Sequence, residues 1–185
     1  GEAVTSLGST VAIKLLSDVP VDDATRGVYS HRLGDRWLVG GASNAGCAVL
    51  REQGFESEEL VTLSQSIDPS APPPYTDYYP LSVNTVGERF PRPDENAVGK
   101  LTPMPENRAD YLHCILHGIS CVEAEAYTVL AELGASKLKR VFTSGGGSQN
   151  PTWIELRQKM LNVPTARAAN IDAAYGAALL AARGT

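Results

Sequence analysis

The chain has 185 residues, of which 43% are hydrophobic and 20% are charged, and its formal net charge is -5. This length is sufficient for one domain with a sizeable core, and the composition is ordinary for a globular protein. No basic stripe is present to neutralise phosphate groups, which argues against nucleic acid as the main partner. No apolar run approaches the length that spans a membrane and no targeting signal is visible, so no membrane partner is expected.

Cysteine and histidine usage does not indicate a metal site. The three cysteines, Cys47, Cys114 and Cys121, form an odd number and lack the spacing of a metal-binding motif. They fit buried thiols in a reducing compartment better than a disulfide framework. His113 and His117 are four residues apart on a predicted helix, but no third ligand is evident. We therefore interpret them as ordinary helix histidines and expect no metal site.

The N-terminal half is predicted to be a β-meander followed by two short helices. The strands are expected over residues 4–7, 11–16, 27–31 and 36–39, and the helices over 44–51 and 56–66. Gly8-Ser9-Thr10 forms the turn between the first two strands, and Gly40-Gly41 is expected to end the fourth. Ser43 or Asn44 is in position to cap the first helix.

Residues 70–105 are rich in proline and have no periodic pattern. A long segment without regular structure is usually functional or wraps another surface. The segment has no low-complexity repeat, and its aromatic residues can anchor it: Tyr75, Tyr78, Tyr79 and Phe90. We therefore expect an ordered loop.

The C-terminal half is predicted to alternate between helices and strands. Helices are expected over residues 106–133, 151–161 and 171–182, and strands over 139–143 and 164–168. The first helix has apolar residues at three- and four-residue steps, and Gly134 ends it. This order predicts a parallel or mixed sheet covered by helices, within one α/β domain that has no internal linker.

A glycine-rich turn between a strand and a helix is the most informative local feature. Gly145, Gly146 and Gly147 follow the strand, Asn150 stands at the N-cap position, and Pro151 stands at the first helical position. Glycines let the backbone approach a flat ligand closely, and a helix N-terminus favours anions. The spacing fits neither a P-loop nor a classical dinucleotide site. Taken alone, the turn is equally consistent with a simple connection.

Several segments together resemble one family. The chain resembles the C-terminal domain of FGGY-type carbohydrate kinases in its GERxP, LEGI-type, adenosine-binding and terminal GAALLA segments, which are Gly87-Glu88-Arg89-Phe90-Pro91, Leu116-His117-Gly118-Ile119, Ser144–Asn150 and Ala174–Ala181. These segments occur in the family's order, and the likeness is strongest to a plant and cyanobacterial branch of xylulose or ribulose kinase-like proteins. The resemblance implies a ribonuclease-H-like fold of the actin and hexokinase type, with a mixed sheet flanked by helices.

The resemblance also implies which residues contact the nucleotide. Gly8, Ser9 and Thr10 match a phosphate-binding hairpin turn, and Gly41 matches a glycine beside the nucleotide. Gly146 and Asn150 match adenosine contacts, and Gly145 and Gly147 shape the slot around them. ATP with Mg²⁺ is the cofactor that this implies, and ATP or ADP and a sugar are the implied small-molecule partners. On the residues alone, Gly8-Ser9-Thr10 is more simply an ordinary hairpin turn.

Two departures from the family pattern bear on activity. The family's catalytic aspartate precedes the segment that matches the first hairpin, so this chain is expected to hold no catalytic base, which would lie upstream of Gly1. Residues 1–185 are expected to be one nucleotide-binding domain, with the sugar-binding domain outside this chain. His117 also replaces the usual glutamate of the LEGI segment. The resemblance implies transfer of the ATP γ-phosphoryl to a sugar, for which a pentulose is the favoured class.

Other functions stay open at this point. The chain is also consistent with a non-catalytic adenine-nucleotide-binding module, or with a partner domain that binds no nucleotide. The expected compartment is the cytoplasm or, from the plant-like resemblance, the plastid stroma. The sequence does not specify the sugar or the oligomeric state.

Overall fold

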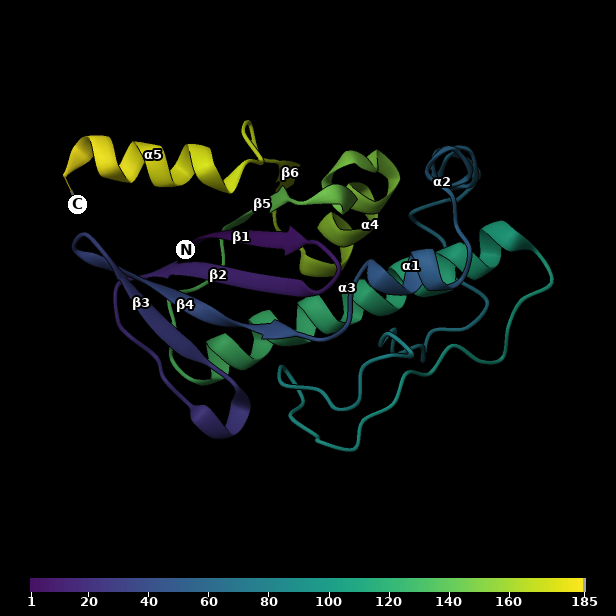
Figure 1. Ribbon diagram of the computed structural model, residues 1–185, viewed down its shortest axis with the longest axis horizontal. Helices are drawn as coiled ribbons and strands as arrows, with labels where there is room; N and C mark the ends of the chain where they lie inside the picture. Colours follow the sequence, from purple (N-terminus) through teal and green to yellow (C-terminus); the bar gives the residue numbers. More distant parts are fainter. Residues whose placement is uncertain (185) are drawn as a thin grey trace.

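The computed structural model describes residues 1–184, which form a six-stranded mixed sheet with helices packed against it (Figure 1). The strands are β1 (Glu2–Leu7), β2 (Val11–Ser17), β3 (Tyr29–Leu33), β4 (Arg36–Ser43), β5 (Arg140–Ser144) and β6 (Thr165–Arg167). Their order across the sheet is β3-β4-β2-β1-β5-β6. The first four pair antiparallel as a meander, whereas β5 joins β1 and β6 joins β5 in parallel. The predicted α/β class with a mixed sheet is confirmed.

The helices follow the predicted order along the chain. They are α1 (Ala48–Glu52), α2 (Ser57–Gln65), α3 (Arg108–Glu132), α4 (Pro151–Leu161) and α5 (Ala173–Arg183), with 3-10 turns η1 (Ala24–Arg26) and η2 (Gly146–Gln149). The long periodic helix is confirmed as α3, which Asn107 caps by accepting from Ala109 N and Asp110 N. The bounds of α4 match the prediction because Asn150 and Pro151 together fix its first turn.

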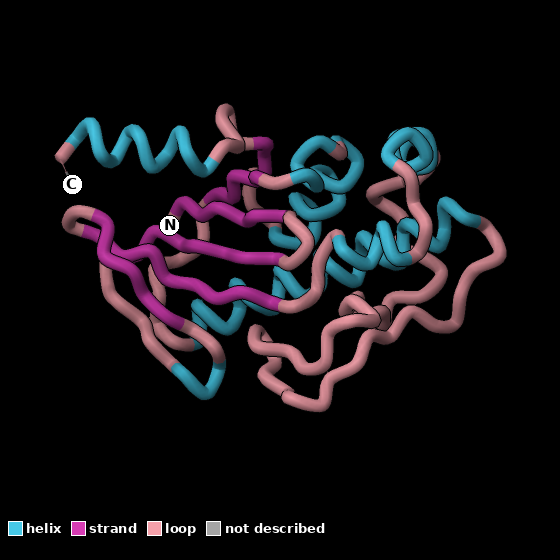
Figure 2. The backbone as a smooth tube through the Cα atoms, viewed as in Figure 1, coloured by secondary structure: helices cyan, strands magenta, loops and turns pink. Residues whose placement is uncertain are grey.

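The long helix α3 forms the centre of the core and lies across one face of the sheet (Figures 1 and 2). Alternate residues of β1 point toward it, so Ala3, Thr5 and Leu7 are buried, whereas Val4 on the opposite face is exposed. By length and composition α3 is apolar enough to cross a membrane, but 67% of its most apolar window is buried inside the domain. This is the pattern of a core helix.

The glycine pair in β4 does not end the strand, which corrects the prediction. Strand β4 continues through Gly40 and Gly41 to Ser43. A Cβ at Gly40 would lie 1.9 Å from the carbonyl oxygen of Ile13 on the neighbouring strand. The glycine is therefore required for close approach of two backbones within the sheet, and not for a turn.

The predicted cap of α1 is also wrong. Helix α1 begins at Ala48, and its N-cap residue Cys47 makes no side-chain cap hydrogen bond. Ser43 instead donates from Oγ to Glu88 Oε2 at 2.6 Å, and Asn44 donates from its backbone N to Glu88 Oε1 at 2.7 Å. Both candidate caps therefore bind the buried carboxylate of Glu88, which belongs to a distant loop, and do not cap α1.

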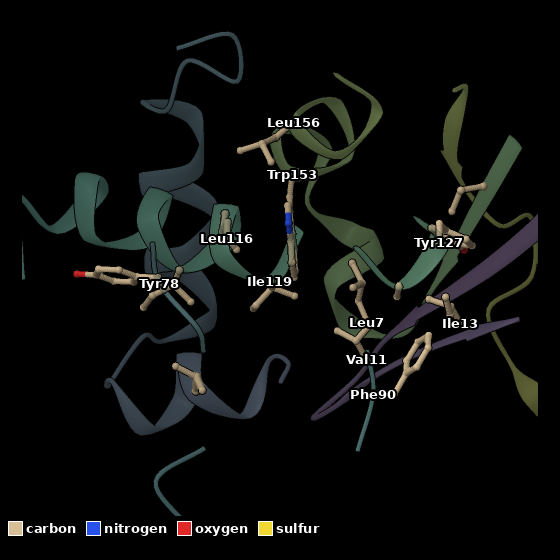
Figure 3. Packing of buried hydrophobic residues seen from close by; sticks show 14 of the residues in the cluster. Leu7, Val11, Ile13, Tyr78, Phe90, Leu116, Ile119, Tyr127, Trp153 and Leu156 are labelled. Carbon is tan, nitrogen blue, oxygen red and sulfur yellow. The ribbon is translucent and has the colours of Figure 1, made fainter. Parts of the chain in front are cut away.

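The proline-rich segment is an ordered loop that wraps the domain, as predicted (Figure 2). It has no helix or long strand, but isolated bridges pair Tyr79 with Lys100 and Glu88 with Asp94. Tyr78 and Phe90 are buried in the main core and anchor the loop there (Figure 3). Helix α5 differs from the rest, because residues 173–182 are all exposed.

Candidate functional site

Two turns meet at one edge of the sheet. Strands β1 and β5 run parallel in register, with Ser6 opposite Ser144, so the turns that follow them start side by side. Gly145 has φ 78°, and a Cβ there would lie 2.6 Å from the carbonyl oxygen of Leu7 and 3.2 Å from the backbone N of Gly8. Only glycine fits this contact. The fold thus brings the predicted hairpin turn and the predicted glycine turn together.

The three glycines of the second turn have different surroundings. A Cβ at Gly147 would lie 2.6 Å from the Trp153 ring and 2.8 Å from Leu7 Cβ, so this glycine packs onto the core. Gly146 is exposed, and a Cβ there would meet no atom within 4 Å. Gly146 is therefore the point at which a ligand can reach the backbone of the turn.

Asn150 makes two hydrogen bonds with the protein. Its Oδ1 accepts from Trp153 N at 3.0 Å, which caps α4, and its Nδ2 donates to Ser64 Oγ of α2 at 2.7 Å. Asn150 therefore ties α2 to the start of α4 beside the glycine turn. Trp153 is buried and donates from Nε1 to Ser120 Oγ of α3, so it packs the helix and does not cover the site (Figure 3).

Backbone hydrogen bonds from the start of α1 hold the hairpin turn in place. The carbonyl oxygens of Gly8 and Ser9 accept from the backbone N of Cys47 and Ala48, at 2.9 and 3.2 Å. The Ser9 and Thr10 side chains remain exposed. A turn that presents hydroxyl groups beside an open glycine is suited to an anionic ligand with a flat part.

Arg51 contacts the hairpin turn and is not among the site residues that the sequence predicted. It lies one helical turn after Cys47, and its Nη2 donates to Ser9 Oγ at 3.2 Å. A signal was present, because residues 47 and 51 of a helix share one face. The contact of that face with the hairpin turn depends on the long-range pairing of β2 with β4, which sequence periodicity does not show.

Gly41 is in a different environment from the other predicted site residues. It lies opposite Ile13 in the sheet, and a Cβ there would lie 2.7 Å from both Phe90 Cγ and the carbonyl oxygen of Gly27. Gly41 is buried. The structure therefore does not bring its α-carbon to the open surface beside Gly146, and its role at a nucleotide remains a prediction.

The three cysteines and the two helix histidines lie in buried or half-buried positions. Within residues 1–184, no group of three or more His, Cys, Asp or Glu side chains is placed to hold a metal ion. Burial raises the pKa of Cys47 to about 11, an effect that the positive charges of Arg157 and Arg51 partly oppose. Burial also lowers the pKa of His113 and of His117, which keeps both rings neutral at neutral pH.

Two open hollows lie elsewhere on the surface, on either side of Arg89. They have volumes of about 460 and 480 Å³, and neither is lined by the two turns. The candidate site is an exposed ledge at a sheet edge, because Ser9, Thr10 and Gly146 are all exposed.

The comparisons with known proteins agree with this geometry. Residues 3–185 match the C-terminal domain of the FGGY family of carbohydrate kinases. The chain belongs to this family. The α/β fold with its mixed sheet is accordingly the expected actin-type ATPase domain of FGGY kinases, and the family uses ATP.

Individual relatives are kinases of small sugars and sugar acids. The chain is 35% identical to a xylulose kinase of Bacillus subtilis (strain 168) over 103 residues. The matched region is 54% of this chain and 20% of that kinase. The chain is also 25% identical to a gluconokinase of the same organism over 170 residues. That region is 84% of this chain and 33% of the gluconokinase. The crystal structure of a xyloylose kinase from Brucella ovis matches with a TM-score of 0.81 at 22% identity, over 100% of this chain and 40% of that one. The chain thus spans less than half of each of these FGGY-type relatives.

Proposed function

We propose that this chain is the ATP-binding half of a sugar kinase that transfers the ATP γ-phosphoryl to a sugar hydroxyl. The observation that carries the proposal is the meeting of the two turns at one sheet edge, where Gly146 is open and Ser9 and Thr10 are exposed beside it. Phosphoryl transfer relies mainly on positioned donors around the phosphates, and this ledge supplies such donors.

Each predicted site residue receives a role in this proposal. The adenosine lies against Gly146, next to the Asn150 bridge between α2 and α4. Gly145 and Gly147 hold the turn in place, and Gly8, Ser9 and Thr10 face the phosphates. Gly41 would act from beneath the Phe90 ring, because that ring covers its α-carbon.

ATP fits the residues of the two turns. The open α-carbon of Gly146 leaves room for a flat group, and the exposed hydroxyls of Ser9 and Thr10 suit phosphate oxygens. Within residues 1–184 no carboxylate cluster is placed to hold Mg²⁺. When bound with the nucleotide, Mg²⁺ would neutralise charge on the phosphates. In this chain the hairpin turn orients the phosphates and the glycine turn orients the adenosine.

The acceptor that we propose is a pentulose, D-xylulose or D-ribulose. The support is the 35% identity to a xylulose kinase, compared with 25% to a gluconokinase. We further propose that the catalytic aspartate and the sugar pocket belong to a second domain that precedes residue 1. We also propose that the chain is related to a plant and cyanobacterial branch of the family. The protein would then be located in the cytoplasm or in the plastid stroma. The free thiols of Cys47, Cys114 and Cys121 fit a reducing compartment.

Sugar-dependent ADP formation by the full-length natural polypeptide tests this function. The substrates are D-xylulose, D-ribulose and D-gluconate, each with ATP and Mg²⁺. We expect turnover with a pentulose and a marked loss on Ser9→Ala together with Gly146→Trp. Unchanged turnover in that double variant would contradict the proposal.

A non-catalytic adenine-nucleotide-binding module is the second candidate. It would use the same ledge, where Gly146 is open and Ser9 and Thr10 are exposed, and it needs no catalytic base. ATP binding without phosphorylation of any of the three acceptors would decide for this module. Absence of both binding and turnover in a folded protein would contradict both candidates.

A further inference from the structure

Arg51 brings a positive charge to the hairpin turn. It lies in the last turn of α1, and its Nη2 is 3.2 Å from Ser9 Oγ. The helix cannot shift freely relative to the turn, because the backbone N of Cys47 and of Ala48 donate to the carbonyl oxygens of Gly8 and Ser9. The position of the guanidinium is therefore set by the same contacts that set the shape of the turn.

The charge of Arg51 is not neutralised within the described part of the chain. Most arginines there have a carboxylate within ion-pair distance, as do Arg26, Arg36, Arg92, Arg108, Arg140 and Arg157. No carboxylate of residues 1–184 lies within that distance of Arg51, and its side chain contacts the Ser9 hydroxyl. An exposed guanidinium has five N–H donors, so most of its donors remain available for an anion.

The charge also lies close to the second turn. Cys47 Sγ donates to the carbonyl oxygen of Leu7 at 3.7 Å and takes a backbone hydrogen bond from Gly147. The positive charges of Arg157 and Arg51 both act to lower the pKa of this thiol. The guanidinium is thus near the junction where the hairpin turn and the glycine turn meet, on the exposed side of that junction.

We propose that Arg51 is a phosphate-binding residue, whose guanidinium contacts the nucleotide phosphates together with the Ser9 hydroxyl. Arginine suits this role because its planar fork binds phosphate oxygens in pairs. The inference rests on the proposed nucleotide site and adds a residue to it. If the inference is right, Arg51 strengthens the binding of ligands that carry phosphates and does not change the binding of adenosine.

Calorimetric titration of the full-length natural polypeptide with adenosine, AMP, ADP and ATP in Mg²⁺ tests this inference. We expect Arg51→Met to weaken ATP and ADP binding by about tenfold, the scale of one lost charge-assisted contact, and to leave adenosine binding unchanged. Arg51→Lys is expected to recover part of the loss, because it keeps the charge without the fork. The loss in Arg51→Met should also shrink as salt rises, because salt screens exposed charges.

Arg32→Met is the matched control. Arg32 is exposed, its Nε donates to the carbonyl oxygen of Gly34 at the far end of the sheet, and it has no carboxylate partner within residues 1–184. We expect this variant to bind all four ligands like the parent. Equal loss for adenosine and ATP, or no loss for either, would overturn the role of Arg51 while leaving the nucleotide site standing. A folded parent that binds neither adenosine nor ATP would overturn the proposed function, and the role of Arg51 with it.

Discussion

Glu123 of α3 and Arg157 of α4 form an ion pair that is completely buried. Arg157 Nε lies 2.6 Å from Glu123 Oε2, Nη2 lies 2.6 Å from Oε1, and both side chains have 0% exposure. Thr143 Oγ1 of β5 accepts from Arg157 Nη1, and Thr5 Oγ1 of β1 donates to Glu123 Oε1. The pair therefore joins two helices to the two parallel strands whose ends carry the candidate site.

Breaking this pair from one side should destabilise the domain strongly. In Arg157→Met the Glu123 carboxylate loses its partner while it stays buried, and we expect a loss of about 3–5 kcal/mol in the free energy of unfolding. Urea unfolding followed by circular dichroism measures it. The double variant Glu123→Leu with Arg157→Leu should lose less than the single variant, because it leaves no unpaired charge. The matched surface control is Arg140→Met, which removes an exposed pair with Glu2 and should have little effect. A single variant as stable as this control would contradict the prediction.

Glu88 should be needed to hold the long loop against the sheet. Its carboxylate accepts from Ser43 Oγ at 2.6 Å and Tyr79 OH at 2.9 Å, and also from backbone N–H groups. Glu88→Gln replaces one acceptor by a donor in this buried position, and we expect a loss of about 2–3 kcal/mol. Chemical unfolding measures the loss, and limited proteolysis should show earlier cleavage within residues 70–105. Glu95→Gln, an exposed change in the same loop, is the control. Equal stability of the two variants would show that the buried contacts matter little.

Gly146→Trp should block adenine-nucleotide binding without unfolding the chain. A Cβ at Gly146 would meet no atom within 4 Å and the position is exposed, so we expect the fold to accommodate a side chain there while the open ledge is filled. We expect a loss of at least about a hundredfold in ATP affinity by calorimetry, comparable to removing a central binding contact. Gly176→Trp is the matched control, because Gly176 is also exposed and open but lies on α5. Retained ATP binding in Gly146→Trp would move the adenosine site away from the glycine turn.

Lys14 should give the domain a distinctive dependence on pH. Its Nζ has no hydrogen-bond partner within residues 1–184 and lies 3.6 Å from the centroid of the Tyr29 ring. Burial lowers the pKa of Lys14 from 10.5 to about 8. Between these values the unfolded chain keeps the proton that the folded chain has lost, so the Lys14 contribution to stability rises with pH.

Comparison of the parent with Lys14→Met isolates this contribution. We expect the stability of Lys14→Met relative to the parent to fall as pH is raised from 8 to 10.5, because only the parent has the titrating group. Urea unfolding at several pH values across this window measures the difference. Lys137→Met, at an exposed lysine, should retain the parent's rise with pH. A constant difference between Lys14→Met and the parent would show that the proton affinity of Lys14 is the same in both states.

Local patterns predicted the elements whose signals lie within a few residues. The start of α4 was predictable because Asn150 caps it and Pro151 fills its first position, and both effects act within one helical turn. The core helix α3 was predictable because its apolar residues recur with helical spacing over many turns. The hairpin of β1 and β2 was predictable because its turn is short and its strands carry the β-branched residues Val4, Thr5, Val11 and Ile13.

The errors occurred where a distant segment overrides a local preference. Gly40 was predicted to end the strand, but its lack of a side chain allows the backbone to approach Ile13 closely. Ser43 and Asn44 read as helix caps, but Glu88, more than forty residues away in sequence, binds both. Arg51 was not predicted because its partner Ser9 lies on a different element, so helical spacing alone does not show their contact.

The sequence by itself determined the family, the order of the elements and the two glycine-containing turns, because these depend on local residue spacing and on motif order. Only the tertiary structure decided that the two turns touch, that Gly146 is open while Gly41 is covered, and that Arg51 stands beside Ser9. These facts follow from the parallel register of β1 with β5 and from the pairing of β2 with β4. Such long-range contacts form only when the whole core packs, so no short stretch of the sequence encodes them.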